Sequence, residues 1–295
     1  MCEITPFGIY CKPCCCSDLI DVTGIAGSGV LNEDQVLIKD NTYAVFDGAS
    51  SLVNNSWQGK SGAWWAAKCA AETLSQKTHN NSDLSLSHLF IKANQKIAGQ
   101  MEQAGVDREN RLGLWSCTGA AIRFYPGLME YAQIGDSLIL CIKKDGSHFL
   151  PAPYHNHDHE TLSAWQALAK QGCTNIRKAL SALIAKTRLQ MNRRFGVLNG
   201  EQHMTHFLKS GTVLLKNIKA VLIFTDGLHW PSEQLSARAD FSTLVNGYLT
   251  SGLHGLHQGV RALERQDPLC QRYPRFKQHD DIAAIALNLG TMIDG

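Results

Sequence analysis

The chain has 295 residues, 44% of them hydrophobic, and its formal net charge at pH 7 is +2. This length allows one large domain or two small ones, and no Pro/Gly/Ser-rich linker divides it. The balanced charge argues against nucleic acid or an anionic membrane as the main partner. No apolar run approaches the roughly 20 residues of a transmembrane segment, and the N-terminus lacks the pattern of a signal peptide. We therefore expect a cytoplasmic protein, unless another route delivers it.

Five of the ten cysteines crowd residues 1–16, and the other five are scattered among apolar neighbours, where they are expected to be buried. Residues 1–18 have no regular pattern and are expected to be irregular. For the cysteines from Cys11 to Cys16, three roles stay open: a structural role, lipidation and metal binding. Adjacent cysteines converge poorly on one tetrahedral ion. We expect a single folded domain over residues 19–295, and a monomer.

In chain order, strand-like runs at 35–38 and 42–46 flank a turn. An alanine-rich helix is predicted over 64–74, and a helix with one apolar face over 86–101. Three strands follow, and the sequence predicts them at 114–124, 129–134 and 138–143.

Residues 151–210 break this rhythm, because prolines and a histidine-rich stretch lead into helical spacing. We expect this segment to be an insertion over one face of the core. His155, His157 and His159 alternate with polar residues, and a solvated loop is favoured over a metal site there. The remaining elements are strands at 212–215 and 219–224, a helix at 241–249 and a last strand at 282–289. This order favours an α+β fold with antiparallel sheets over βαβ winding.

Two hydrophobic runs each end on an aspartate followed by glycine, Asp47-Gly48 and Asp226-Gly227. Such an ending places a carboxylate at the rim of a sheet, and the glycine lets a backbone carbonyl or a ligand come close. Three further acidic sites are Glu33-Asp34, Asp136 and Asp280-Asp281. Carboxylates crowded at one end of a sheet raise each other's pKa values unless cations lie among them. The pattern predicts a metal site with oxygen ligands, which suit Mg²⁺ or Mn²⁺.

The order and spacing of these motifs resemble the PPM family, the metal-dependent serine/threonine protein phosphatases of type 2C. The resemblance runs from about Gly27 to Leu289. It implies a four-layer α-β-β-α sandwich of two antiparallel sheets, with a helical flap insertion at about 151–210. It also implies hydrolysis of phosphoserine or phosphothreonine in a protein substrate, by a water that two Mn²⁺ or Mg²⁺ ions activate.

The resemblance assigns a metal-binding role to five positions. Asp47 would bridge both ions, and Asp226 and Asp280 would complete the first. Glu33 and the backbone carbonyl of Gly48 would complete the second.

Two more aspartates receive roles from the resemblance. Asp34 would orient water near the ions, and Asp136 would help to hold a third, weaker ion that some members bind. Many eukaryotic members have a histidine directly after Asp-Gly, where this chain has Ala49; many bacterial relatives lack that histidine as well.

One departure from the family pattern concerns the substrate phosphate. Members commonly carry an arginine about five residues before the Glu-Asp pair, but the stretch 27–31 contains no basic residue. Arginine makes bidentate, charge-assisted contacts that small side chains cannot replace. The candidates for a substitute cation are Lys60, Arg188, Arg193 and Arg194.

The missing arginine keeps a second function open. The chain could be a pseudophosphatase, a silent or weak member that binds a protein partner. The complete set of acidic residues favours an active enzyme instead. A third hypothesis is a phosphatase that acts on small phosphoesters.

Overall fold

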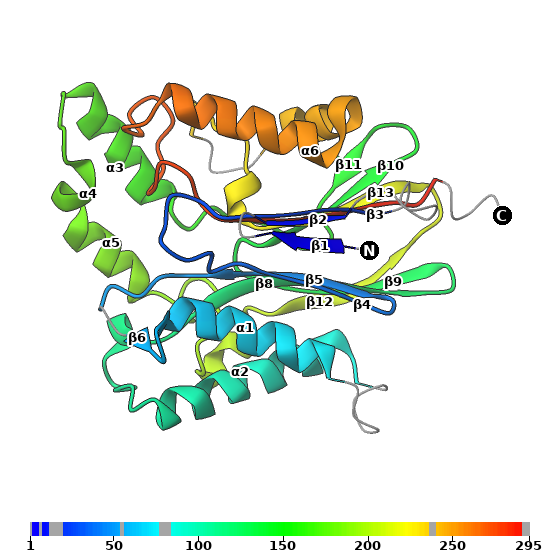
Figure 1. Cartoon of the computed structure of the whole chain (residues 1–295), viewed down its shortest axis with the longest axis horizontal. Coiled ribbons are helices and arrows are strands. Elements are labelled where there is room, and N and C mark those ends of the chain that lie inside the picture. Colours follow the sequence, from blue (N-terminus) through cyan, green and yellow to red (C-terminus); the bar gives the residue numbers. More distant parts are fainter. Residues whose placement is uncertain are drawn as a thin grey trace.

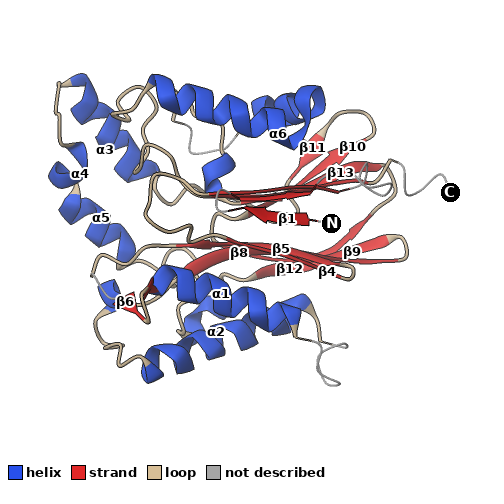
Figure 2. Cartoon of the chain, in the orientation of Figure 1, coloured by secondary structure: helices blue, strands red, loops and turns tan. Residues whose placement is uncertain are grey.

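The computed structural model describes the backbone of residues 2–5, 8–11, 20–53, 56–76, 84–235 and 240–290, and side chains from residue 20 onward within these ranges. Two sheets face each other (Figures 1 and 2). Helices α1 (Gly62–Ser75) and α2 (Leu86–Gln103) cover the outer face of one sheet, and α6 (Ser242–Gln266) covers the outer face of the other. The predicted α-β-β-α sandwich is confirmed. No helix among the described residues is long and apolar enough to cross a membrane.

The first sheet has five strands, and all its neighbouring pairs are antiparallel. Its order is β12 (Lys209–Leu214), β9 (Leu128–Ile134), β8 (Cys117–Tyr125), β5 (Thr42–Gly48) and β4 (Gln35–Lys39). Three alanines of α1, Ala66, Ala67 and Ala70, are fully buried. Their small side chains let the helix lie close to β5, which it contacts.

The second sheet has seven strands, again with antiparallel neighbours. Its order is β1 (Cys2–Thr5), β2 (Gly8–Cys11), β3 (Ile20–Ile25), β14 (Ile282–Asn288), β13 (Ile218–Phe224), β10 (Leu138–Lys143) and β11 (His148–Phe149). A two-stranded ladder of β6 (Ser56–Trp57) and β7 (Lys60–Ser61) precedes α1.

Strands β1 and β2 correct the expectation of an irregular N-terminus. They extend the sheet beyond β3, with Ile9 opposite Gly24. Backbone pairing to an existing edge needs no apolar periodicity, so the sequence pattern gave no sign of them. Residues 12–19, which include Cys14, Cys15 and Cys16, lie outside the described residues.

The core between the sheets is built from their central strands. Val45, Ile122, Ile139, Ile223 and Ile285 are fully buried in one cluster. Because helices cover the outer faces of these strands, the runs are apolar on both sides instead of alternating. The buried strands therefore fix the positions of their own ends, and so they also fix where the following loops begin.

Helix α6 is longer than the predicted 241–249 and bends at Gly252. This glycine has φ +67° and ψ −175°, a conformation that residues with a Cβ rarely adopt. The carboxylate of Asp21 on β3 accepts a hydrogen bond from the backbone N–H of Leu253 (3.2 Å). The second part of α6 thus begins anew with its own cap, and two helical segments cover this face.

The segment between β11 and β12 contains α3 (His159–Lys170), α4 (Ile176–Ala179), α5 (Ser181–Arg188) and the 3₁₀ turn η2 (Gln202–His206). Helices α3 to α5 lie at one end of the sandwich (Figure 1). Trp165, Ile176 and Leu180 from this segment form a small core with Cys270, which lies in the loop after α6. The Trp165 indole N–H donates to the carbonyl of Cys270 (2.7 Å). The insertion is thereby attached to the loop that leads to Asp280.

Candidate metal centre

Both Asp-Gly pairs place their glycine against a backbone carbonyl, as the sequence predicts. A Cβ built on Gly48 would lie 2.8 Å from the carbonyl oxygen of Glu33. A Cβ on Gly227 would lie 1.9 Å from the carbonyl oxygen of Asp281. Any side chain at either position would push the neighbouring loop away. The glycines therefore bring the acidic loops 33–34 and 280–281 up to the ends of β5 and β13.

Four aspartates from these loops and strand ends form what we call the core carboxylates: Asp34, Asp47, Asp226 and Asp280. Burial raises the pKa of Asp47 well above its ordinary value, and the charges of Asp34 and Asp226 raise it further, as do those of Asp136 and Asp280. Burial likewise raises the pKa of Asp226, with Asp280 the strongest neighbouring charge. The structure thus brings together side chains that lie up to 246 positions apart in the sequence, from Asp34 to Asp280.

Asp34 lies inside this group, next to Thr225, the residue that follows β13. Its Oδ2 accepts a hydrogen bond from the Thr225 hydroxyl (2.7 Å), and its exposed fraction is 7%. Burial raises its pKa well above the ordinary value, and the charges of Asp281 and Asp280 add to that effect. The threonine hydroxyl fixes the direction in which the carboxylate points.

Asp281 ties the acidic loops to each other, a role that sequence reasoning did not assign. Its two carboxylate oxygens accept the backbone N–H groups of Gly27 (2.7 Å) and Glu33 (2.8 Å). These hydrogen bonds join residues that are 254 and 248 positions apart in the sequence. The only sequence signal was its place directly after Asp280, which does not reveal that its side chain turns toward the other loop.

Glu33 shares the backbone of this site, but its carboxylate lies between two serine hydroxyls. Ser50 donates to Oε2 (2.6 Å) and Ser61 donates to Oε1 (2.5 Å). Ser61 also caps α1 by accepting the backbone N–H of Trp64 (3.2 Å). The predicted role of Glu33 as a ligand of a second ion stays a prediction, as does that of the Gly48 carbonyl.

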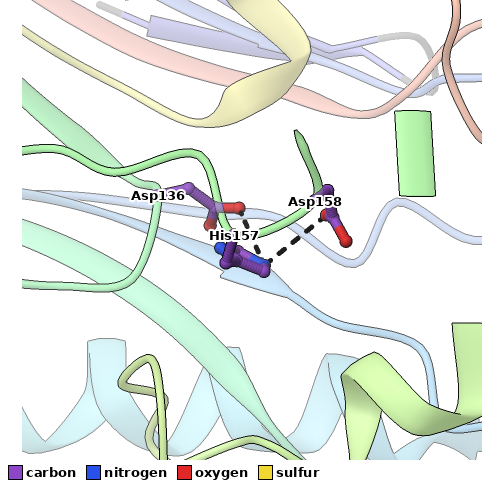
Figure 3. Close-up of side chains that lie close together, drawn as sticks. All are labelled: Asp136, His157 and Asp158. Carbon is purple, nitrogen blue, oxygen red and sulfur yellow. Dashed lines mark ion pairs between the residues drawn. The ribbon is translucent and has the colours of Figure 1, made fainter. Parts of the chain in front are cut away.

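Asp136 takes part in a second acidic group. It sits in the β9–β10 turn after Gly135, whose φ is +76°. His157 Nε2 lies 3.7 Å from Asp136 Oδ2 and 3.5 Å from Asp158 Oδ2 (Figure 3). The ligand atoms of these three residues all lie within 4.8 Å of one another, so they could hold a cation. We call Asp136, His157 and Asp158 the flap cluster.

The position of His157 differs from the solvated loop expected for residues 155–159. Its ring stacks on that of Phe195, with 4.0 Å between centroids and 13° between planes. Only 18% of its side chain is exposed. His159, in turn, begins α3. Sequence spacing could not reveal this, because the partners Asp136 and Phe195 lie on other segments.

Lys277 is the cation that the structure adds to the core carboxylates. Its Nζ lies 2.7 Å from Asp280 Oδ1. Burial lowers the pKa of this ammonium, but the charges of Asp280, Asp47 and Asp281 outweigh that effect and raise it above its ordinary value. Lys277 was not among the cations predicted to replace the arginine.

The four predicted substitutes have other surroundings. Lys60 lies over the Trp64 ring at 5.3 Å, and Arg188 is a favourable charge for Asp158. Arg193 lines a cavity together with Arg108 and Arg111. Arg194 is exposed beyond α5.

The comparisons with known proteins agree with this architecture. A family model described as protein phosphatase 2C matches residues 24–254. The chain therefore belongs to the protein phosphatase 2C family. No protein of curated function matches the sequence.

Solved structures are similar in fold at low sequence identity. The serine/threonine phosphatase PstP/Ppp of Mycobacterium tuberculosis is 16% identical, with a TM-score of 0.55 over 91% of this chain and 97% of that one. The PstP catalytic domain in complex with two manganese ions is 15% identical, with a TM-score of 0.52 over 91% and 96%. PppA, a regulatory component of T6SS in Pseudomonas aeruginosa, is 14% identical, with a TM-score of 0.53 over 91% and 96%.

Proposed function

We propose that this protein is a metal-dependent protein phosphatase that hydrolyses phosphoserine or phosphothreonine with the help of two Mn²⁺ or Mg²⁺ ions. The observation that carries the proposal is the convergence of Asp34, Asp47, Asp226 and Asp280 at one end of the sandwich, with burial and mutual repulsion raising the pKa of the first three. Membership of the protein phosphatase 2C family supports it, as does the two-manganese complex of the similar PstP domain.

The residues present suit divalent ions. The core carboxylates offer oxygen donors only, which are the ligands that Mg²⁺ and Mn²⁺ prefer. Desolvated like charges repel each other, and a cation between them removes that repulsion. Asp47, Asp226 and Asp280 would hold the ions. When bound, two such ions activate water and neutralise charge on the phosphoryl oxygens during in-line attack.

Other residues of the chain position these ligands. The Thr225 hydroxyl orients the Asp34 carboxylate. The Asp281 carboxylate holds the loop of Glu33 by accepting the backbone N–H of Glu33. The flap cluster, next to the core carboxylates through Asp136, is the candidate place for a third ion. No protein nucleophile is needed for this chemistry.

The experiment measures phosphate release from a phosphothreonine peptide with Mn²⁺, with Mg²⁺ and with a chelator. The variants are Asp226→Ala and Asp280→Ala, and the control is Asp145→Ala in the exposed β10–β11 turn. We expect metal-dependent release that both site variants lose and the control keeps. No release from folded, Mn²⁺-binding protein would contradict the proposal and favour the silent, partner-binding form.

A further inference from the structure

We propose that Lys277 takes the place of the missing arginine and binds the phosphoryl group of the substrate beside the metal centre. The inference rests on the proposed function, since it assigns the phosphate contact of that same site. Its first support is position: the ammonium lies 2.7 Å from Asp280 Oδ1, and a third of the side chain (33%) is exposed. The cation therefore reaches both the core carboxylates and the solvent from which a substrate arrives.

Three other basic residues near this loop contact carboxylates outside the core group. Arg261 lies 2.7 Å from Glu264 Oε2, and both side chains are buried. His279 contacts the same glutamate oxygen at 2.8 Å. Arg275 pairs with Asp267 at 2.8 Å. Lys277 differs from these three, because its partner is itself a predicted metal ligand.

The ion pair between Lys277 and Asp280 explains how the ammonium becomes available to a substrate. If divalent ions bind at Asp280, the carboxylate charge that now attracts Lys277 would be neutralised, and the ammonium would stand beside the ions without its counter-ion. A phosphoryl group at the metal centre supplies the negative charge it then lacks. An ammonium offers three donors but not the fork of a guanidinium, so it binds phosphate as a point charge.

The backbone around Lys277 is held in place. Its carbonyl oxygen accepts a hydrogen bond from the Cys270 thiol (3.4 Å), and the Cys270 carbonyl in turn accepts from Trp165 of α3 (2.7 Å). Lys277 thus stands where the helical insertion meets the acidic loop. A side chain with free rotamers on a fixed backbone can leave Asp280 without leaving the site.

The test compares Lys277→Met with Lys277→Arg and with the control Lys219→Met, an exposed lysine at the start of β13, the end remote from Asp226. Three quantities are measured: the affinity of the Mn²⁺-loaded protein for inorganic phosphate, the Mn²⁺ affinity, and KM and kcat on the phosphothreonine peptide. We expect Lys277→Met to weaken phosphate binding and raise KM by about tenfold, the size of one charge-assisted contact. Mn²⁺ should bind at least as tightly as to the wild type, because a competing cation is gone.

The Lys277→Arg variant keeps the positive charge, so it should retain phosphate affinity, and thermal unfolding checks that each variant is folded. Unchanged phosphate affinity and KM in Lys277→Met, with tighter Mn²⁺ binding, would overturn the inference and leave Lys277 as a counter-ion only. A wild type that binds Mn²⁺ and phosphate without hydrolysing the peptide would contradict the proposed function. Even then, the phosphate affinities would decide the role of Lys277.

Discussion

The core carboxylates and the flap cluster are both acidic groups beside the same strand ends, yet they differ in what balances their charge. Within the core group, burial and mutual repulsion raise the pKa values of Asp34, Asp47 and Asp226. In the flap cluster, His157 lies between two carboxylates and Arg188 is a further favourable charge for Asp158. The first group has more negative charge than Lys277 can neutralise. In the second, burial also raises the pKa of Asp158, but Arg188 acts on that carboxylate as a favourable charge. We therefore expect the two ions of the proposed mechanism to bind in the core group.

The largest expected effect separates the two groups by activity. Asp47→Asn should lower phosphate release by about a thousandfold or more, because several kcal/mol of charge stabilisation would depend on the ions that we propose Asp47 holds. Asp158→Asn, an equally conservative change in the flap cluster, should leave most of the activity. Steady-state kinetics with Mn²⁺ on both variants measures this difference. Equal losses would show that the two groups act as one centre.

The next largest effect tests how the core group is assembled. Gly227→Ala places a Cβ 1.9 Å from the Asp281 carbonyl oxygen, so the loop that carries Asp280 must move. We expect the free energy of unfolding to fall by roughly 1–3 kcal/mol. The control Gly99→Ala in α2 has open space around its Cβ and should raise stability by up to about 1 kcal/mol. Chemical denaturation of both variants checks this, and a neutral Gly227→Ala would refute the close approach.

A smaller effect concerns pH in the absence of metal. The pKa of Asp47 is raised in the folded chain, so its carboxyl favours folding most below the ordinary value of 3.8. As the pH rises, the unfolded chain ionises first, and the wild type loses stability relative to Asp47→Asn until the raised pKa is passed. We expect the stability advantage of the variant to grow from pH 4 upward in chelator.

Asp145 supplies a control of opposite sign for that measurement. Its pKa is lowered by its hydrogen bonds to Ser147, so the wild-type carboxylate gains stability relative to Asp145→Asn as the pH rises through the ordinary value. Denaturant titrations at several pH values compare the two. An Asp47→Asn advantage that does not change with pH would contradict the repulsion we describe.

The smallest effect is expected in the flap cluster itself. His157→Ala removes a partly exposed ion pair and the stacking on Phe195. Such contacts each contribute up to about 1 kcal/mol, so the free energy of unfolding should fall by no more than that sum. Thermal unfolding without metal measures it. A loss well above that sum would place the cluster among the structural supports of the fold.

The fold could be predicted where buried strands and amphipathic helices leave local patterns. Strand β10 begins and ends at the predicted residues, and α2 extends the predicted helix by two residues. Strands β1, β2 and β3 were not predicted, because they lie toward the edge of their sheet and carry few consecutive apolar residues. The continuation of α6 beyond Gly252 was also missed, since its cap, Asp21, comes from the far end of the chain.

The candidate site shows the same division. Asp47 and Asp226 could be singled out because each follows an apolar strand and precedes a glycine. Lys277, Asp281 and His157 could not be assigned, because their roles depend on side-chain contacts with distant segments. Polar residues in loops have no period that marks their partners. Pattern therefore identified the acidic positions but not the cation and the hydrogen bonds that surround them.

The most direct test of the two-ion core site is a Mn²⁺ titration of chelator-treated wild type and Asp47→Asn, with bound ions and phosphate release measured in the same samples. We predict that the wild type binds two ions tightly per chain and that hydrolysis appears as they bind. The variant should lose both the tight ion binding and the hydrolysis. Hydrolysis that persists in Asp47→Asn, or wild-type protein that binds two ions and releases no phosphate, would contradict this account.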